Sequence, residues 1–295
     1  MNIEMIDKTQ HRKGILLISC SLLAFGLMQI FVAKTGPEIP IVEQVFFRNL
    51  IGMMVAGFFV QRKKISLKVI RSHVRPLLAR SIAGYIAVFL LFYASRNAAQ
   101  SDVTIIVRTG MFSISAVSSI FLREKIGRVR AMAMLIAMIG ALIAANPAFD
   151  SSGLPLLAAL GVVLCDTVSY PLLSFFTGRV HAMIVVLFFS TFSTLFSLLL
   201  MIPSFVVPDI GNLFCLLMIG STAAIGQITL TYSHQYVPAG ELSVYQQLAI
   251  VCNTILALLF LHEIPTLRAC AGGVIVLTAS LLLFRYRERR ASAAC

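Results

Sequence analysis

The sequence predicts an all-α integral membrane protein, in which ten transmembrane helices form two inverted repeats of five helices each. Three observations lead to this fold class: the composition, a series of long apolar stretches, and a similarity between the two halves of the chain. Of the 295 residues, 59% are hydrophobic and 12% are charged, whereas soluble proteins average about 25% charged residues. A water-soluble core cannot bury so much apolar surface, so the bilayer must surround the chain.

Ten apolar stretches fill nearly the whole chain, with short connections between them. Each approaches the roughly 20 residues that a helix needs to cross the hydrocarbon layer. The expected spans are residues 14–33, 41–60, 77–95, 102–121, 127–145, 154–175, 182–202, 211–233, 241–261 and 267–284. No connection is long enough to hold a soluble domain.

The basic residues indicate how the spans are oriented. If the N-terminus is cytoplasmic, only Lys34, Arg96 and Arg268 fall in outer loops. The inner segments then hold Lys8, Arg12, Lys13, Arg62, Lys63, Lys64, Lys68, Arg71, Arg75, Arg123, Lys125, Arg128, Arg130, Arg179, Arg285, Arg287, Arg289 and Arg290. This asymmetry predicts a bacterial cytoplasmic (inner) membrane protein with both termini in the cytoplasm. The net charge of +12 is then an orientation signal, aided by anionic membrane lipid, and does not indicate nucleic acid binding.

The two halves of the chain resemble each other at a constant offset. Tyr93–Ile126 matches Tyr232–Pro265 in order, with Asp102 facing Glu241 in the alignment. Because each half holds an odd number of spans, the second copy must cross the membrane in the opposite sense. Inverted repeats of this kind are typical of secondary transporters, whose substrate sits near the midplane between the copies. The expected organisation is a cytoplasmic N-terminus (1–13), a first repeat (14–146), a second repeat (147–284) and a basic cytoplasmic tail (285–295).

Each half ends in the same succession of features: a polar loop, a span, a Phe-Leu-x-Glu motif and a Gly-rich span. In this sequence these are Ala99–Glu124 with Gly127–Ala145, and Ala239–Glu263 with Ala269–Leu283. With the Phe47-Arg48 pair and ten spans, the chain resembles the EamA-type transporters of the drug/metabolite transporter (DMT) superfamily. The resemblance implies a transporter. Some carriers of this type have an acid in the sixth span, including ones assigned to S-adenosylmethionine uptake.

Few charged residues lie inside the spans, and each is a candidate for function, because such a charge costs at least about 2.5–3.5 kcal/mol. Arg48, Arg108 and Asp166 are the deepest. Arg48 either binds substrate or serves structurally, by capping backbone carbonyls or pairing with Asp166. Arg80 lies a few residues from the cytoplasmic end of its span, so we expect its long side chain to reach the interface and act as an anchor.

A polar stripe accompanies Arg108 on its helix. It consists of Thr104, Arg108, Met111, Ser115 and Ser118, which follow helical spacing. The repeat places Ser243, Gln247 and Thr254 at matched positions in the second half. Packing between helices also recruits Ser and Thr, but it does not require Arg108 opposite Gln247. We therefore expect both stripes to line a cavity.

Asp166 stands one helical turn before Tyr170, with Pro171 next to it. A buried carboxylate in a water-filled cavity can carry a coupling proton, pair with a cationic substrate group, or neutralise an arginine. Proline within a span frees a backbone carbonyl and often accompanies a cavity. Neutral hydrogen-bonding groups at similar depth, each a candidate substrate contact or interhelical bond, are Gln29, Gln227, Tyr245, Gln246 and Asn253.

These residues favour a secondary carrier that moves a small polar metabolite by alternating access. Arg108 would hold a carboxylate and Asp166 an amine or a proton, while Tyr170 and Tyr245 would contact the side chain. An amino acid or similar zwitterion fits this mixture, with S-adenosylmethionine among the candidates. A multidrug or organic-cation exporter is the alternative.

An intramembrane enzyme is a more distant alternative. Asp166 has no partner acid for aspartyl chemistry, and the histidines lie at or outside the span ends. The six cysteines contain no C-x-x-C pair, so neither a metal nor another cofactor is expected. The protein is expected to be a monomer or a homodimer, and Gly140 and Gly272 could support a close helix contact.

Overall fold

The computed structural model describes residues 8–98, 100–122, 127–145, 153–261 and 266–293, and these residues form helices and short connections without a strand. The helices are α1 (Lys8–Lys34), α2 (Ile41–Arg62), α3 (Val69–Asn97), α4 (Gln100–Phe121), α5 (Arg128–Ala145), α6 (Gly153–Phe175), α7 (Ala182–Met201), η1 (Ile202–Ser204), α8 (Ile210–Tyr236), α9 (Ala239–Tyr245), η2 (Gln246–Leu248), α10 (Ala249–Leu261) and α11 (Leu267–Ala293). Glu124 and Glu263 of the two Phe-Leu-x-Glu motifs lie outside the described residues.

The helices coincide with the expected spans. Among the described residues, nine helical segments are long and apolar enough to cross a membrane, and α5 is a further helix of 18 residues. The expected ninth span differs from the prediction, because the 3-10 turn η2 divides it into α9 and α10. The all-helical membrane fold is thus confirmed, with one break that no Pro or Gly at residues 246–248 announces.

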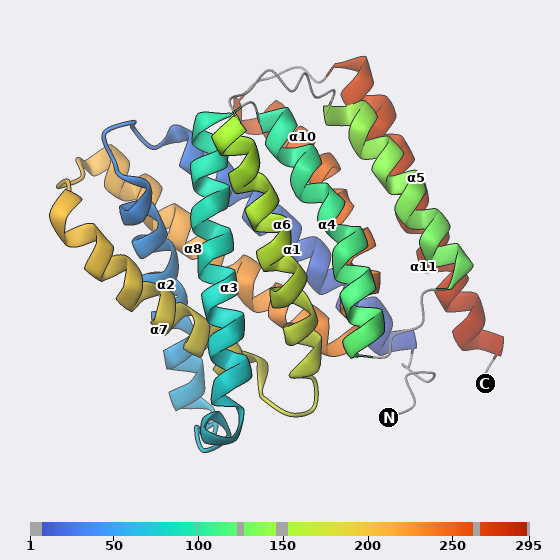
Figure 1. The fold of residues 1–295 in the computed structure, drawn as a ribbon, viewed down its shortest axis with the longest axis horizontal. Coiled ribbons are helices and arrows are strands. Elements are labelled where there is room, and N and C mark those ends of the chain that lie inside the picture. Colours follow the sequence, from blue (N-terminus) through green and yellow to red (C-terminus); the bar gives the residue numbers. More distant parts are fainter. Residues whose placement is uncertain (1–7, 99, 123–126, 146–152, 262–265, 294–295) are drawn as a thin grey trace.

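Successive helices alternate in direction, so α1 and α6 start at opposite ends of the bundle (Figure 1). The packing shows the same inversion. In the two repeats α6 is the equivalent of α1, and α8 is the equivalent of α3. The first helix of each repeat packs closely against the third helix of the other, as α1 does with α8 and α6 with α3. Equivalent helices also meet each other, because α2 packs along α7, α4 contacts α9, and α5 packs along α11. The fold is therefore two inverted five-helix repeats.

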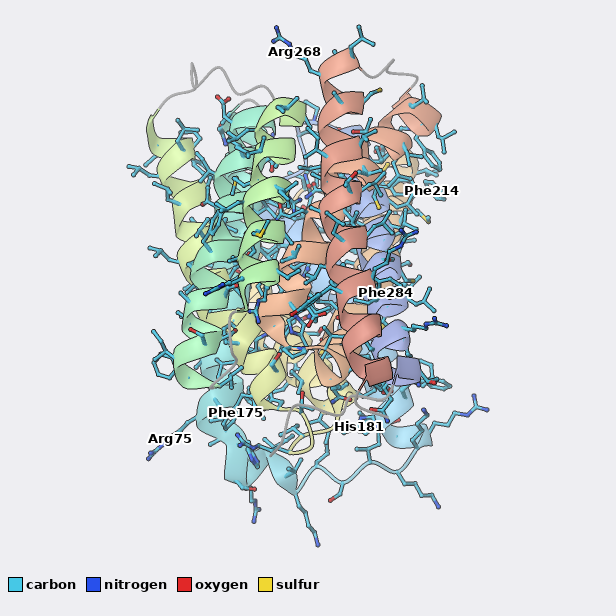
Figure 2. The ribbon with its side chains drawn as sticks, turned by 90° about the vertical axis from the view of Figure 1, so that its right-hand side faces the viewer. Arg75, Phe175, His181, Phe214, Arg268 and Phe284 are labelled. Carbon is cyan, nitrogen blue, oxygen red and sulfur yellow. The ribbon has the colours of Figure 1, made fainter. Side chains whose placement is uncertain are left out.

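The two ends of the bundle carry different charged residues. Arg75 and His181 lie at one end and Arg268 at the other (Figure 2), and both termini lie toward the first of these (Figure 1). The loop 63–68 and the turn 176–181 belong to the same end. We call this the basic end.

Two glycines allow α5 and α11 to approach closely. A Cβ at Gly272 would collide with the backbone of Gly140 and with Ala144, and a Cβ at Gly140 would lie 2.8 Å from the carbonyl oxygen of Gly272. Small residues commonly let transmembrane helices come together in this way. The close helix contact expected from Gly140 and Gly272 thus forms inside one chain, between the last helices of the two repeats.

We predict that Gly272→Ala lowers the melting temperature of the detergent-solubilised protein. The added methyl meets backbone, and overpacking of this kind costs about 1–3 kcal/mol. Gly273→Ala is the matched control, because its Cβ would make an ordinary contact with Val251 at 3.5 Å. Equal melting temperatures for the two variants would contradict the close contact.

Candidate substrate site

A cavity of about 200 Å³ lies within the bundle and is lined by helices of both repeats. Most of the candidate residues lie on its wall. They are Gln29, Arg48, Arg108, Asp166, Tyr170, Gln227, Gln246 and Asn253. The structure also adds Arg80, Phe25 and Phe189 to the lining. Residues more than 100 positions apart in the chain thus meet at one place.

An apolar core cluster extends from the cavity wall toward the basic end. Leu173, Phe176, Ile184, Val237 and Leu242 are buried in one core cluster, and all lie at helix ends on that side. Below this cluster, α1 and α9 are joined by a buried contact. His11 Nε2 and Glu241 Oε1 are 2.9 Å apart, which connects the first repeat to the second.

Arg48 and Arg80 form one wall of the cavity, on α2 and α3. Arg48 is 6% exposed, and its Nη1 donates a hydrogen bond to Asn49 Oδ1 at 3.0 Å. The guanidinium carbon of Arg80 lies 4.5 Å from the centre of the Phe189 ring, within range of a cation–π interaction. Each arginine acquires partial compensation for its burial, but in the described part of the chain neither forms an ion pair.

The prediction that Arg80 reaches the cytoplasmic interface is wrong. Its side chain is 4% exposed and lines the cavity. The reason lies one turn further along α3: Gly84 has no side chain, and the Arg80 guanidinium occupies the space where a Cβ would be. Arg80 therefore extends into the bundle instead of toward water.

Arg108 lies on α4 and contacts the break in the second repeat. Its Nη1 donates a hydrogen bond to the carbonyl oxygen of Gln246 at 3.1 Å. Gln246 begins the 3-10 turn η2, and such turns inside helices often mark functional positions. Interrupted helices with accessible carbonyls are characteristic of transporter substrate sites.

Asp166 of α6 faces the cavity without an ion-pair partner. Among the described residues no ion pair joins Asp166 to Arg48, so the alternative of a tight Asp166–Arg48 pair is not realised in this structure. Asp166 instead shares the cavity wall with Arg80 and Arg108. Beside it, the Tyr170 ring stacks on His234 at 5.6 Å. His234 lies in the last turn of α8, at a span end as expected, but its side chain is buried and lies 3.2 Å from the Ser174 hydroxyl.

Tyr245 and Gln247 do not line the cavity. Tyr245 is 1% exposed and packs in the core cluster, and the Gln247 amide donates to the carbonyl oxygen of Ser243. The prediction of two cavity-lining polar stripes is likewise wrong beyond Arg108. Ser115 donates to the carbonyl oxygen of Gly240 at 3.1 Å and lies 3.3 Å from the Ser243 hydroxyl. Because α4 and α9 are equivalent helices that contact each other, their polar stripes meet there.

A comparison of the sequence with models of known protein families identifies the family of this chain. The EamA-like transporter family matches residues 12–146 and again residues 153–285. The chain belongs to the EamA-like transporter family. EamA domains form the inverted-repeat fold of the DMT superfamily, which agrees with the packing described above. The resemblance drawn from the sequence motifs is confirmed, and the protein is a membrane transporter.

Similar EamA proteins include named and unnamed transporters. The pseudopaline exporter CntI of Pseudomonas aeruginosa is 28% identical over 94% of this chain and 98% of its own. An uncharacterised transporter of Helicobacter pylori is 23% identical over 92% and 94% of the two chains. Solute carrier family 35 member G1 of Mus musculus is 22% identical over 90% and 77%. One crystal structure shares the fold, with a TM-score of 0.77 at 16% identity over 92% and 99% of the two chains.

Two neighbouring glutamines test the position of the cavity in this EamA protein. We predict that Gln246→Cys, in a background without the native cysteines, reacts quickly with a water-soluble thiosulfonate in detergent. Gln247→Cys is the matched control and should react at least about tenfold more slowly, because a buried thiol is inert. Gln246 lines the cavity, whereas Gln247 is 2% exposed. Equal labelling rates would place the cavity wall elsewhere.

Proposed function

We propose that the protein is a secondary carrier that moves a small amino-acid-like zwitterion through the central cavity by alternating access. The observation that carries the proposal is the presence of both signs of charge in one cavity between two inverted repeats. Arg108 and Asp166 enter it from α4 and α6, one from each repeat. A site of this composition can bind a carboxylate and an amine together.

The neutral wall suits the rest of such a molecule. Gln29, Gln227 and Gln246 offer amide donors and acceptors, and Tyr170 offers an aromatic face and a hydroxyl. The carboxylate would bind to the Arg108 guanidinium and the amine to Asp166. Asp166 is also the candidate for carrying a coupling proton, since it lies in the cavity without an ion-pair partner among the described residues.

Packing at one end of the bundle supports alternating access. The core cluster and the His11–Glu241 contact lie on the side of the basic end, as expected for a state that is closed on that side. Inverted repeats permit the opposite state, because each repeat can adopt the conformation of the other. The basic end would face the cytoplasm, as the positive-inside rule predicts.

An organic-cation exporter is the second candidate. Asp166, Phe25 and Phe189 favour it, because acids and aromatic faces bind cations. Arg48, Arg80 and Arg108 oppose it by repulsion. The relatives are named as transporters, which supports transport over catalysis. The name of the pseudopaline exporter supports export of a polar metabolite, and S-adenosylmethionine remains a candidate substrate.

We expect Arg108→Ala and Asp166→Asn each to lower transport into proteoliposomes by at least about tenfold, the effect of losing about 1.4 kcal/mol of binding. Labelled L-glutamine, L-methionine and S-adenosylmethionine are the probes, and unlabelled organic cations are the competitors. Arg71→Gln is the control, because Arg71 is exposed on α3 outside the cavity. Full transport by both cavity variants would contradict the proposed site.

A further inference from the structure

The charges of the cavity are unequal. Arg48, Arg80 and Arg108 line it with Asp166 as the one acidic side chain on the wall. Arginine keeps its positive charge in proteins, so a cavity that contains only water holds an excess of positive charge. Nothing in the described residues offsets this excess by an ion pair.

The arginines form two groups by their place in the fold. Arg48 lies on α2 over the Phe25 ring, and Arg80 lies on α3, which contacts α2, over the Phe189 ring. Arg108 lies on α4 and is bonded to η2 of the second repeat. We call the first group the Arg48–Arg80 pole and the second the Arg108 pole.

Each arginine retains a donor for a ligand. Nε of Arg48, Nε and Nη1 of Arg80, and Nε of Arg108 are buried without a hydrogen-bond partner. Nη1 of Arg48 and Nη1 of Arg108 are bonded to Asn49 and Gln246. In the described part of the chain, Nη2 of the three arginines has no bond and is not among the buried atoms. The Nη2 group of each of the three arginines therefore remains available to a ligand in the cavity.

Such an arrangement is costly unless an anion completes it. An unpaired charge within the membrane costs at least about 2.5–3.5 kcal/mol even on lenient scales. A structural role would be served better by a direct bond to Asp166, which the geometry does not show. Guanidinium groups bind carboxylates through paired hydrogen bonds, and two poles can accept two carboxylates.

We propose that the cavity selects a metabolite with at least two acidic groups and one amine, the second acidic group binding at the Arg48–Arg80 pole. This proposal rests on the proposed function and makes it more specific. The first carboxylate binds Arg108 and the amine binds Asp166, so the second acid distinguishes the substrate from a neutral amino acid. Arg80 is the specificity-determining residue.

The experiment compares two ligands that differ in one charged group. L-Glutamate and L-glutamine have nearly the same shape, but only L-glutamate has a second carboxylate. Binding to the full-length protein in nanodiscs is measured by isothermal titration calorimetry. L-Lysine and inorganic phosphate are titrated as well, to separate a zwitterion with two acids from a cationic amino acid and from a simple anion.

We expect L-glutamate to bind at least about tenfold more tightly than L-glutamine, and Arg80→Gln to remove most of that difference. Arg75→Gln is the matched control, since Arg75 is an exposed arginine on the same helix, away from the cavity. Melting temperatures show whether each variant is folded, and Arg80→Lys provides a second test in which the charge is kept.

The outcomes separate this proposal from the proposed function. If L-glutamine binds as tightly as L-glutamate and Arg80→Gln changes neither, the second acidic site is refuted while the zwitterion carrier stands. Tighter binding of L-lysine, or binding of phosphate as tight as that of L-glutamate, also overturns the proposal. If none of the amino acids binds, both proposals fail.

Discussion

The structure depends on how charges are held inside a layer that cannot solvate them. Arg48, Arg80, Arg108 and Asp166 sit within helices that are otherwise apolar. Each arginine has a different partner that offsets part of the cost of its burial. Arg48 donates to an amide, Arg80 lies over an aromatic ring, and Arg108 donates to a backbone carbonyl. Direct pairing with Asp166 would stabilise the empty protein better. Because no such ion pair is present among the described residues, the charged side chains on the cavity wall remain available to bind a ligand.

The inverted repeats explain where the charges can meet. Equivalent helices that contact each other, such as α4 with α9 and α5 with α11, place matched surfaces together. Small and hydroxyl side chains suit these contacts, as at Gly140 with Gly272 and Ser115 with Ser243. The cavity forms where the repeats do not match. In the first repeat α4 is continuous, whereas η2 interrupts the equivalent segment of the second and turns the Gln246 carbonyl toward Arg108.

Much of this could be predicted from the sequence, because the signals were physical. Apolar length located the helices, and the rarity of charge in hydrocarbon singled out Arg48, Arg108 and Asp166, all of which line the cavity. Arg80 was missed because distance from a span end does not say in which direction a long side chain extends. The available signal was Gly84, one turn away, which leaves room for the guanidinium.

The second error came from assuming an unbroken helix. Gln247 was expected at the cavity because the repeat matches it to Arg108, and Tyr245 because of its depth in the expected span; both interpretations treated residues 241–261 as one continuous helix. The 3-10 turn has about three residues per turn instead of 3.6, so it changes which side chains face inward. No Pro or Gly at residues 246–248 marks the turn. Periodicity alone could not have revealed it.

The most direct measurement of the central claim is a high-resolution cryo-electron microscopy structure of the protein in nanodiscs with saturating L-glutamate. The account predicts density in the cavity, with one carboxylate against Arg108, the other against Arg80 and the amine against Asp166. An empty cavity in which Asp166 pairs directly with an arginine, or ligand density confined to the surface, would contradict it.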